Sequence, residues 1–160
     1  MNRLAPTEGA ATGEGNAARR FIHLRVHSAY SLLEGALPVG KIIAHAVKDA
    51  APAIAITDSN NLFGALEFSQ KTTKEGIQPL IGCQASLSFS GEATEASRGN
   101  GHRRQGPQFH PVVLIAATQE GYANLVRLVS RSYLETPPGE PVHMMTGDLE
   151  ALSSGLIYLT

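Results

Sequence analysis

Two short apolar runs, each ending in polar residues and separated by a helical pattern, constrain this sequence most. They lie between Phe21 and Asn61. The first run ends near His27, and the second, AIAIT, is followed at once by Asp58. In a parallel sheet, the carboxyl ends of the strands hold ligands at one edge. We therefore expect four polar side chains to converge at this edge, namely those of His23, Arg25, His27 and Asp58.

Strand and helix patterns alternate along the rest of the chain. Apolar runs predict strands at 21–26, 53–57, 79–89, 111–117 and 156–159, and helical spacing predicts helices at 38–49, 62–74, 120–134 and 146–152. This order favours a mostly parallel α/β domain, either an open sheet or a barrel. A chain of 160 residues corresponds to one domain or part of one. Because no helix follows the last strand, we expect an incomplete domain, the N-terminal part of something larger.

The same patterns predict which side chains are buried. In the first strand, Ile22, Leu24 and Val26 should face the core, with His23 and Arg25 on the other face. In the second helix, Phe63, Leu66 and Phe68 fall near the buried side, and Gly76 fits the helix end. In the third strand, Leu80 and Ile81 should be buried.

Two segments show no apolar period. Residues 1–20 are rich in Gly, Ala, Asn and Thr, which predicts a disordered lead before a domain at 21–160. Residues 90–108 are rich in Gly, Ser, Glu and Arg, which predicts a mobile surface loop. The cluster His102-Arg103-Arg104 could bind phosphate, but a solvated loop tip is the simpler interpretation.

Composition narrows the class of protein. The formal net charge of −1 gives no whole-chain footprint for nucleic acid or for an acidic membrane surface. A single cysteine, Cys83, excludes an internal disulfide, and its place in an apolar run predicts a buried structural thiol. No apolar run is long enough for a membrane span, and the N-terminus lacks the apolar stretch of a secretion signal. We expect a cytoplasmic protein.

Several residues could in principle hold a metal ion. His23, His27, Asp58 and Glu67 offer nitrogen and oxygen donors of the kind that zinc, manganese or iron takes. Metal-assisted phosphoester hydrolysis needs two or three ions held by clustered histidines and carboxylates. Here the cluster is thin, so spacing alone favours ordinary hydrogen bonds at strand ends over a working metal site. Motifs for phosphate-loop, serine-hydrolase, zinc-protease and CxxC chemistry are missing from the sequence.

Three strings carry a family resemblance. They are FIHLRVHSAYSLLEGA, PAIAITDSNNLFGALEF and GIQPLIGC, supported by HPVVLIAATQEGYANLVRLVSRSYLE and GLIYL. Together they resemble the N-terminal PHP (polymerase and histidinol phosphatase) domains of bacterial DNA polymerase III alpha subunits. The resemblance covers roughly residues 21–160, and it favours the main replicative polymerase over its error-prone paralogue. It implies the N-terminal part of a distorted α/β barrel with metal ligands at the carboxyl ends of the strands.

The resemblance also implies a ligand set. The HxH motif of metal-binding members falls on Arg25 and His27, and their TDH motif falls on Thr57-Asp58-Ser59. Glutamates of those members fall on Glu67 and Gln84. His27, Asp58 and Glu67 therefore keep the pattern as remnant ligands, whereas Arg25, Ser59 and Gln84 replace expected ligands. The guanidinium of Arg25 could take the place of a lost cation and pair with Asp58 or Glu67.

The family context implies a DNA-directed DNA polymerase that uses Mg²⁺ in a palm domain, which this chain does not contain. The chain itself would then be a structural or partner-docking module with a degenerate metal site and no bound cofactor. Its partners would be other subunits of the DNA polymerase III holoenzyme, including the proofreading exonuclease subunit, with DNA reached through the parent protein and no membrane involved. The alternative is a residual phosphoesterase or proofreading nuclease that keeps Zn²⁺ or Mn²⁺. A third hypothesis, an unrelated α/β binding domain, is disfavoured by the motif strings.

Overall fold

The structure is a computed structural model, and it describes residues 21–88 and 109–160. The segments predicted as a disordered lead (1–20) and as a mobile loop (90–108) lie outside the described residues.

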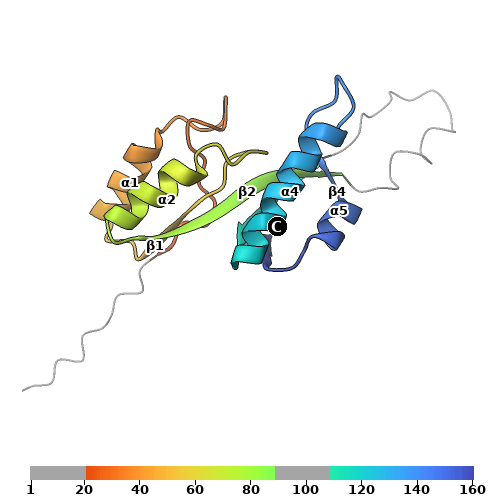
Figure 1. The fold of residues 1–160 in the computed structure, drawn as a ribbon. Coiled ribbons are helices and arrows are strands. Elements are labelled where there is room, and N and C mark those ends of the chain that lie inside the picture. The colour runs from red at the N-terminus through yellow and green to blue at the C-terminus, as the bar shows by residue number, and fades with distance from the viewer. Residues whose placement is uncertain (1–20, 89–108) are drawn as a thin grey trace, which may run out of the picture.

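Helices and strands alternate along most of the described chain, with β2 and β3 as successive strands, and Figure 1 shows their arrangement. The first group of elements is α1 (Val39–Lys48), β1 (Ala53–Ile56), α2 (Ala65–Lys74) and β2 (Gln78–Ser88). The second group is β3 (Phe109–Ala116), α4 (Gln119–Glu135), β4 (Met144–Met145), α5 (Thr146–Ala151) and β5 (Leu156–Leu159). All but one of the predicted elements are confirmed, most within about three residues at each end.

The strands form one open, mixed sheet in the order β1-β2-β3-β5, with β4 beside β2. β1 and β4 run parallel to β2, whereas β2 pairs with β3 and β3 pairs with β5 in antiparallel fashion. The prediction of a mostly parallel sheet was therefore wrong. The pattern of apolar residues predicts that a segment is a strand, but it does not indicate whether the strand runs parallel or antiparallel to its neighbours. Within the described residues β5 pairs on one side only, so this part of the sheet is not closed into a barrel.

The first predicted strand, at 21–26, is not a regular strand. Its backbone lies beside β1 and accepts hydrogen bonds at His23 O from Ala55 N (2.9 Å) and at Val26 O from Thr57 N (2.8 Å). The two acceptors, His23 and Val26, are three residues apart, whereas the two donors, Ala55 and Thr57, are two residues apart. This mismatch interrupts the regular ladder. The expected alternation fails with it: Ile22 and Leu24 are 36% and 38% exposed, and only Val26 packs against the core.

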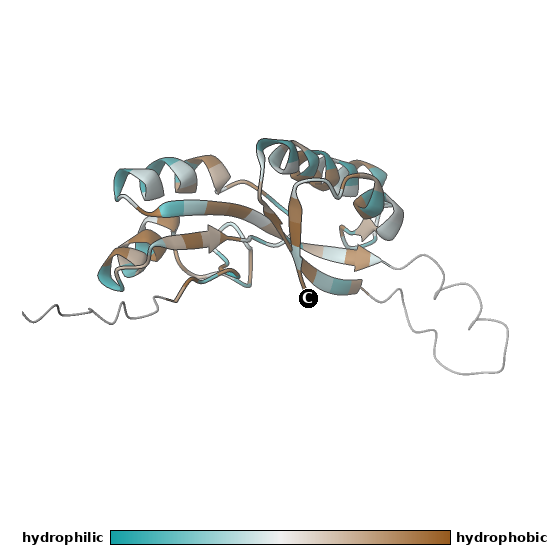
Figure 2. Cartoon of the chain, turned by 90° about the horizontal axis from the view of Figure 1, so that it is seen from below, coloured by the Kyte–Doolittle hydropathy of each residue, from teal (hydrophilic) through white to brown (hydrophobic). Residues whose placement is uncertain are grey.

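The core consists of two clusters joined by β2. The first gathers buried residues of α1, β1 and α2, and the second gathers those of β2, β3 and α4. In α1 the stripe Val39, Ile42, Ile43 and Ala46 is at most 4% exposed. Burying each large aliphatic side chain of this kind contributes about 1.5–3 kcal/mol. Figure 2 shows apolar residues along the strands at both ends of the molecule.

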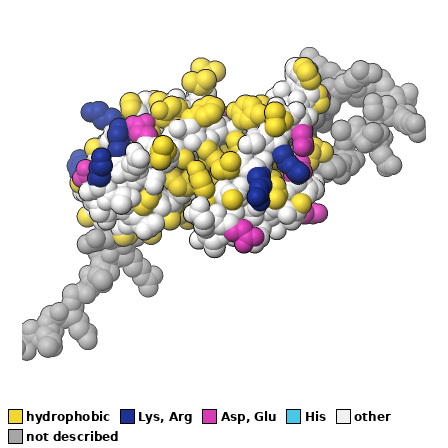
Figure 3. Space-filling model, in the orientation of Figure 1, with side chains coloured by type: hydrophobic (Ala, Val, Ile, Leu, Met, Phe, Trp, Pro, Cys, Tyr) yellow, Lys and Arg dark blue, Asp and Glu magenta, His cyan; other side chains and the backbone are white. Residues whose placement is uncertain are grey.

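Helix α2 is less buried than predicted. Phe68 is fully buried, but Phe63 and Leu66 are both 70% exposed, so their predicted burial was wrong. Gly76, with φ of +73°, follows the helix end as predicted. Leu80 and Ile81 are half-buried. On the face shown in Figure 3, apolar side chains gather between α2 and α4. Among the described residues, no helix is long and apolar enough to cross a membrane.

Candidate functional site

The chain that leaves β1 continues beside β2 and brings distant residues to one edge. Gln84 N donates to Asp58 O (3.0 Å), and Asn60 N donates to Gln84 O (2.9 Å). Ser59 and Gln84 form a parallel bridge. Side chains of bridged residues share a face of a sheet. Ser59 and Gln84, two positions where the sequence departs from the family pattern, are therefore neighbours.

Asp58 ties this edge to the loop that follows the first predicted strand. Its carboxylate is 2% exposed and accepts from Ser28 N (2.6 Å), Ser28 Oγ (2.8 Å) and Ser31 Oγ (2.6 Å). Ser28 and Ser31 are themselves 0% and 1% exposed. A buried carboxylate is tolerated when its oxygens are satisfied in this way. We call Asp58, Ser28 and Ser31 the serine–aspartate clamp.

The loop held by the clamp is tightly closed. The carbonyl oxygen of Ser31 accepts from Glu34 N (3.0 Å) and Gly35 N (2.8 Å). A Cβ atom on Gly35 would lie 1.9 Å from Ser28 O, so only glycine allows this approach. At the tip, Leu33 has φ of +68° and is fully exposed.

Glu34, in this loop, is a site residue that the sequence patterns missed. Its Oε2 lies 3.3 Å from His27 Nδ1 and also accepts a hydrogen bond from Ser59 Oγ. The side chain of Glu34 is 51% exposed, whereas that of His27 is 17% exposed. Loops carry no hydrophobic period, so the available signal was only the presence of a carboxylate seven residues after His27.

Two buried polar atoms at this edge have no hydrogen-bond partner among the described residues. They are Nε2 of His27 and Oε1 of Gln84. Native proteins pair most such atoms, so each exception calls for an explanation, and a catalytic role or a bound ion is among the usual ones. A third unpaired atom of the described residues, Oγ1 of Thr72, lies on α2. The cluster of His27, Glu34, Ser59 and Gln84 is therefore the candidate functional site, and the clamp lies beside it.

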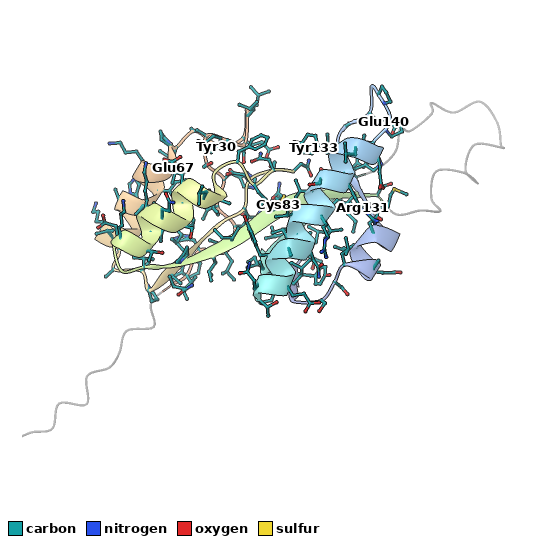
Figure 4. All side chains as sticks on the ribbon, in the orientation of Figure 1. Tyr30, Glu67, Cys83, Arg131, Tyr133 and Glu140 are labelled. Atoms are coloured by element: carbon teal, nitrogen blue, oxygen red, sulfur yellow. The ribbon has the colours of Figure 1, made fainter. Side chains whose placement is uncertain are left out.

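Glu67 lies outside this cluster. On α2 it accepts from Lys71 Nζ (2.6 Å) and from Tyr30 Oη (3.3 Å), and Figure 4 labels both Tyr30 and Glu67. The hydrogen bond from Lys71 is the main reason why the pKa of Glu67 is lowered. An exposed pair one helical turn apart is an ordinary surface interaction.

Arg25 and His23 do not join the cluster either. Arg25 is exposed, and the ion pairs within the described residues include none from Arg25 to Asp58 or Glu67. The predicted pairing was therefore wrong, because serine donors already occupy the carboxylate of Asp58. His23 instead packs edge-on against Phe21, with ring centroids 4.7 Å apart. Of the four side chains expected to converge, His27 lies in the cluster, and Asp58 accepts from the backbone N–H of Ser28, the residue next to His27.

The described residues do not fit a metal ion. Nowhere in the described ranges do three or more His, Cys, Asp or Glu side chains gather so that they could hold one. An open pocket of about 300 Å³ lies elsewhere, between α4 and the turn leading to α5. Arg131 and Asp148 at this pocket pair with each other at 2.6 Å. None of the predicted site residues lines it.

Cys83 lies on β2 inside the second core cluster and is fully buried, as predicted. Burial raises the pKa of its thiol to about 12. A thiol in this state is a poor nucleophile near neutral pH, because the thiolate is the reactive form. Figure 4 labels Cys83 on β2 between the two helix groups.

Comparisons with known proteins agree on one relationship. The family described as PHP domain matches residues 23–160. The DNA polymerase III subunit alpha of Borreliella burgdorferi is 41% identical over 138 residues, which cover 86% of this chain and 12% of that protein. The same subunit of Caulobacter vibrioides is 37% identical over 151 residues, covering 94% of this chain and 12% of that protein.

A solved amidohydrolase from Chromobacterium violaceum matches with a TM-score of 0.44 and 24% identity, over 71% of this chain and 34% of that one. The chain spans 12% of the length of each of the two DNA polymerase III alpha subunits named above.

Proposed function

The chain belongs to the PHP domain family, and from this we propose that it is a structural and subunit-docking part of a replicative DNA polymerase alpha subunit. It is homologous to the N-terminal region of DNA polymerase III alpha subunits. That homology, which extends over most of the chain, is the observation that carries the proposal.

The arrangement of donors supports a module without a working metal site. Arg25, Ser59 and Gln84 stand where the resemblance places ligands, and Arg25 is exposed. Of the remnant ligands, Asp58 is saturated by the clamp and Glu67 is paired with Lys71 on α2. His27 and Glu34 remain together, but two donors are fewer than a closed site for zinc or manganese requires.

In the parent protein, polymerisation would take place in another region that holds Mg²⁺ through carboxylates. The chain would contribute surface for other subunits of the DNA polymerase III holoenzyme, the proofreading exonuclease subunit among them. DNA would be bound through the parent protein.

One observation favours the alternative, a residual metal-dependent phosphoesterase or proofreading nuclease. The Nε2 atom of His27 and the Oε1 atom of Gln84 are buried and have no hydrogen-bond partner within residues 21–88 and 109–160. Both atom types can ligate a metal, and unpaired buried polar atoms are costly to keep.

Metal analysis separates these two functions. The full-length protein would be purified without chelator, incubated with Zn²⁺ and Mn²⁺, desalted, and analysed by mass spectrometry. The proposal predicts far less than one ion per chain, and the variant Glu34→Ala should not change this value. One or more tightly bound ions per chain that are lost in Glu34→Ala would overturn the metal-free module and support the enzyme.

Docking needs its own measurement. The purified exonuclease subunit would be passed over immobilised full-length alpha subunit, with and without residues 21–160. The proposal predicts that binding is lost with the deletion while the remaining protein stays folded by circular dichroism. Unchanged binding would show that docking occurs elsewhere.

A further inference from the structure

We infer that Asp58 is a positioning residue for Glu34: through the serine–aspartate clamp it fixes the loop that holds Glu34 between His27 and Ser59. Asp58 accepts its side-chain hydrogen bonds from Ser28 and Ser31, not from Glu34. It therefore acts at a distance, through the backbone of the loop. This gives Asp58, which the resemblance marks as a remnant ligand, a different role that requires no metal.

Ser31 connects the loop to the chain that follows β1. Its hydroxyl donates to Asp58 Oδ1 (2.6 Å) and accepts from Ser59 N (3.0 Å). One buried oxygen thus connects the loop to two consecutive residues after β1. Because Ser31 is 1% exposed, water cannot readily replace either bond.

The backbone of Ser31 is also hydrogen-bonded to the backbone of Glu34. The carbonyl oxygen of Ser31 accepts from the backbone N–H groups of both Glu34 and Gly35, at 3.0 and 2.8 Å. The backbone of Glu34 is therefore fixed relative to the same residue that the clamp holds. The side chain of Glu34, half-exposed, then contacts His27 Nδ1 and Ser59 Oγ with a single oxygen.

The tip of the loop has little apolar packing, although hydrogen bonds from Ala29 N to Leu37 O (2.9 Å) and from Asn61 Nδ2 to Tyr30 O (3.2 Å) also hold the loop. Leu33, the residue before Glu34, adopts φ of +68°, which costs energy for a branched side chain. Leu32 and Leu33 are 82% and 106% exposed, so the loop tip has little apolar packing. The buried contacts of the clamp therefore contribute to the conformation that presents Glu34, and Ser31 is the clamp residue whose carbonyl oxygen accepts from the Glu34 backbone.

The inference deepens the proposed function, on which it rests for the importance of this cluster. Its test is separate, because it reads the environment of His27 and not metal content or subunit binding. In the full-length protein, acylation of each histidine by diethyl pyrocarbonate would be followed by mass spectrometry. His45, exposed on α1, serves as the internal reference.

Two variants and their combination test whether Ser31 affects His27 through Glu34. Glu34→Ala removes the side chain that lies against Nδ1, and Ser31→Ala removes the clamp hydroxyl. We expect each to raise the acylation rate of His27 relative to His45 by about fivefold, the size expected for losing one hydrogen bond. The double variant should react no faster than Glu34→Ala alone, because Ser31 acts through Glu34. Ser132→Ala, at a serine of α4 that is 3% exposed, is the matched control and should leave His27 unchanged.

Four outcomes would overturn the inference. His27 could keep its native rate in Ser31→Ala, the two effects could multiply in the double variant, or Ser132→Ala could act as strongly as Ser31→Ala. If Ser31→Ala does not fold, Ser28→Ala removes the other clamp hydroxyl, and the same expectations apply to it. The fourth outcome, a rise at His27 that is matched at His45, would show general loosening and would also contradict positioning.

Discussion

Asp58 and Ser31 are 27 residues apart in the sequence, yet a buried hydrogen bond of 2.6 Å joins their side chains. The bond connects the end of a core strand to a surface loop whose tip has almost no packing of its own. The stability of that loop is therefore determined from the strand side.

Replacing Asp58 should destabilise the protein more than replacing other carboxylates. Asp58→Asn removes the charge that three buried donors face, so we expect a loss of about 1.5–3 kcal/mol in the free energy of unfolding. Glu67→Gln, at a surface pair, should cost less than about 0.5 kcal/mol, and Arg25→Ala less than about 1 kcal/mol. Urea unfolding measures all three. Equal losses for Asp58→Asn and Glu67→Gln would contradict the clamp.

Replacing two different glycines by alanine should change the free energy of unfolding in opposite directions. Gly35→Ala would place a methyl group 1.9 Å from Ser28 O and should cost more than about 2 kcal/mol, since backbone must move. Gly40, in α1, has no atom within 4 Å of such a methyl group. Gly40→Ala should therefore stabilise the protein by about 0.5–1 kcal/mol. Thermal unfolding gives the sign of each change, and a harmless Gly35→Ala would mean that the loop is less closed than described.

Neighbouring leucines at the loop tip should respond in opposite directions to the same substitution. Leu33 is held at φ of +68°, which glycine adopts without the cost of roughly 1–2 kcal/mol that other residues bear. After the entropy that glycine adds to the unfolded chain, Leu33→Gly should stabilise by about 0.5 kcal/mol. Leu32→Gly has no such strain to relieve and should destabilise by about 0.5–1 kcal/mol. Denaturant midpoints would reveal the difference, which vanishes if Leu33 is unstrained.

The buried thiol of Cys83 should make stability fall at alkaline pH. Its pKa is raised from about 9 to about 12 by burial, so between these values the unfolded state releases a proton that the folded state keeps. The free energy of unfolding then decreases as pH rises, by up to about 1.4 kcal/mol per pH unit. Cys83→Ala, compared with the native chain by urea unfolding from pH 7 to 10.5, should lack this contribution. Parallel pH profiles for the two proteins would show that the thiol ionises in both states.

The regular elements could be predicted because their patterns are local. The helical spacing of Val39, Ile42, Ile43, Ala46 and Val47 predicts α1, although Val47 itself is 45% exposed, and the run AIAIT predicts β1. Prediction failed where the outcome depends on tertiary contacts: Phe63 and Leu66 fit a buried face by spacing, but nothing in the described residues packs over them. The direction of β3 against β2 is likewise a property of the assembled sheet.

The candidate site was predicted only in part. His27 and Ser59 both contact Glu34, and Ser59 forms a bridge with Gln84. Asp58 was expected as a ligand, yet its oxygens accept from serines in a loop that carries no pattern. Glu34 was missed for the same reason. The placement of a loop side chain depends on the hydrogen bonds that close the loop, and these are not encoded in any simple period.

The two core clusters that β2 joins are also separate in the order of synthesis. The first core cluster draws all its buried residues from Val39 to Ile77, and the second begins at Cys83. During synthesis, residues of the first cluster are therefore complete before any buried residue of the second is made. During synthesis, N-terminal segments leave the ribosome first and are available to fold first. The first half of β2 can then pair with β1 while its second half, still without β3, is the exposed edge on which the rest of the sheet is built.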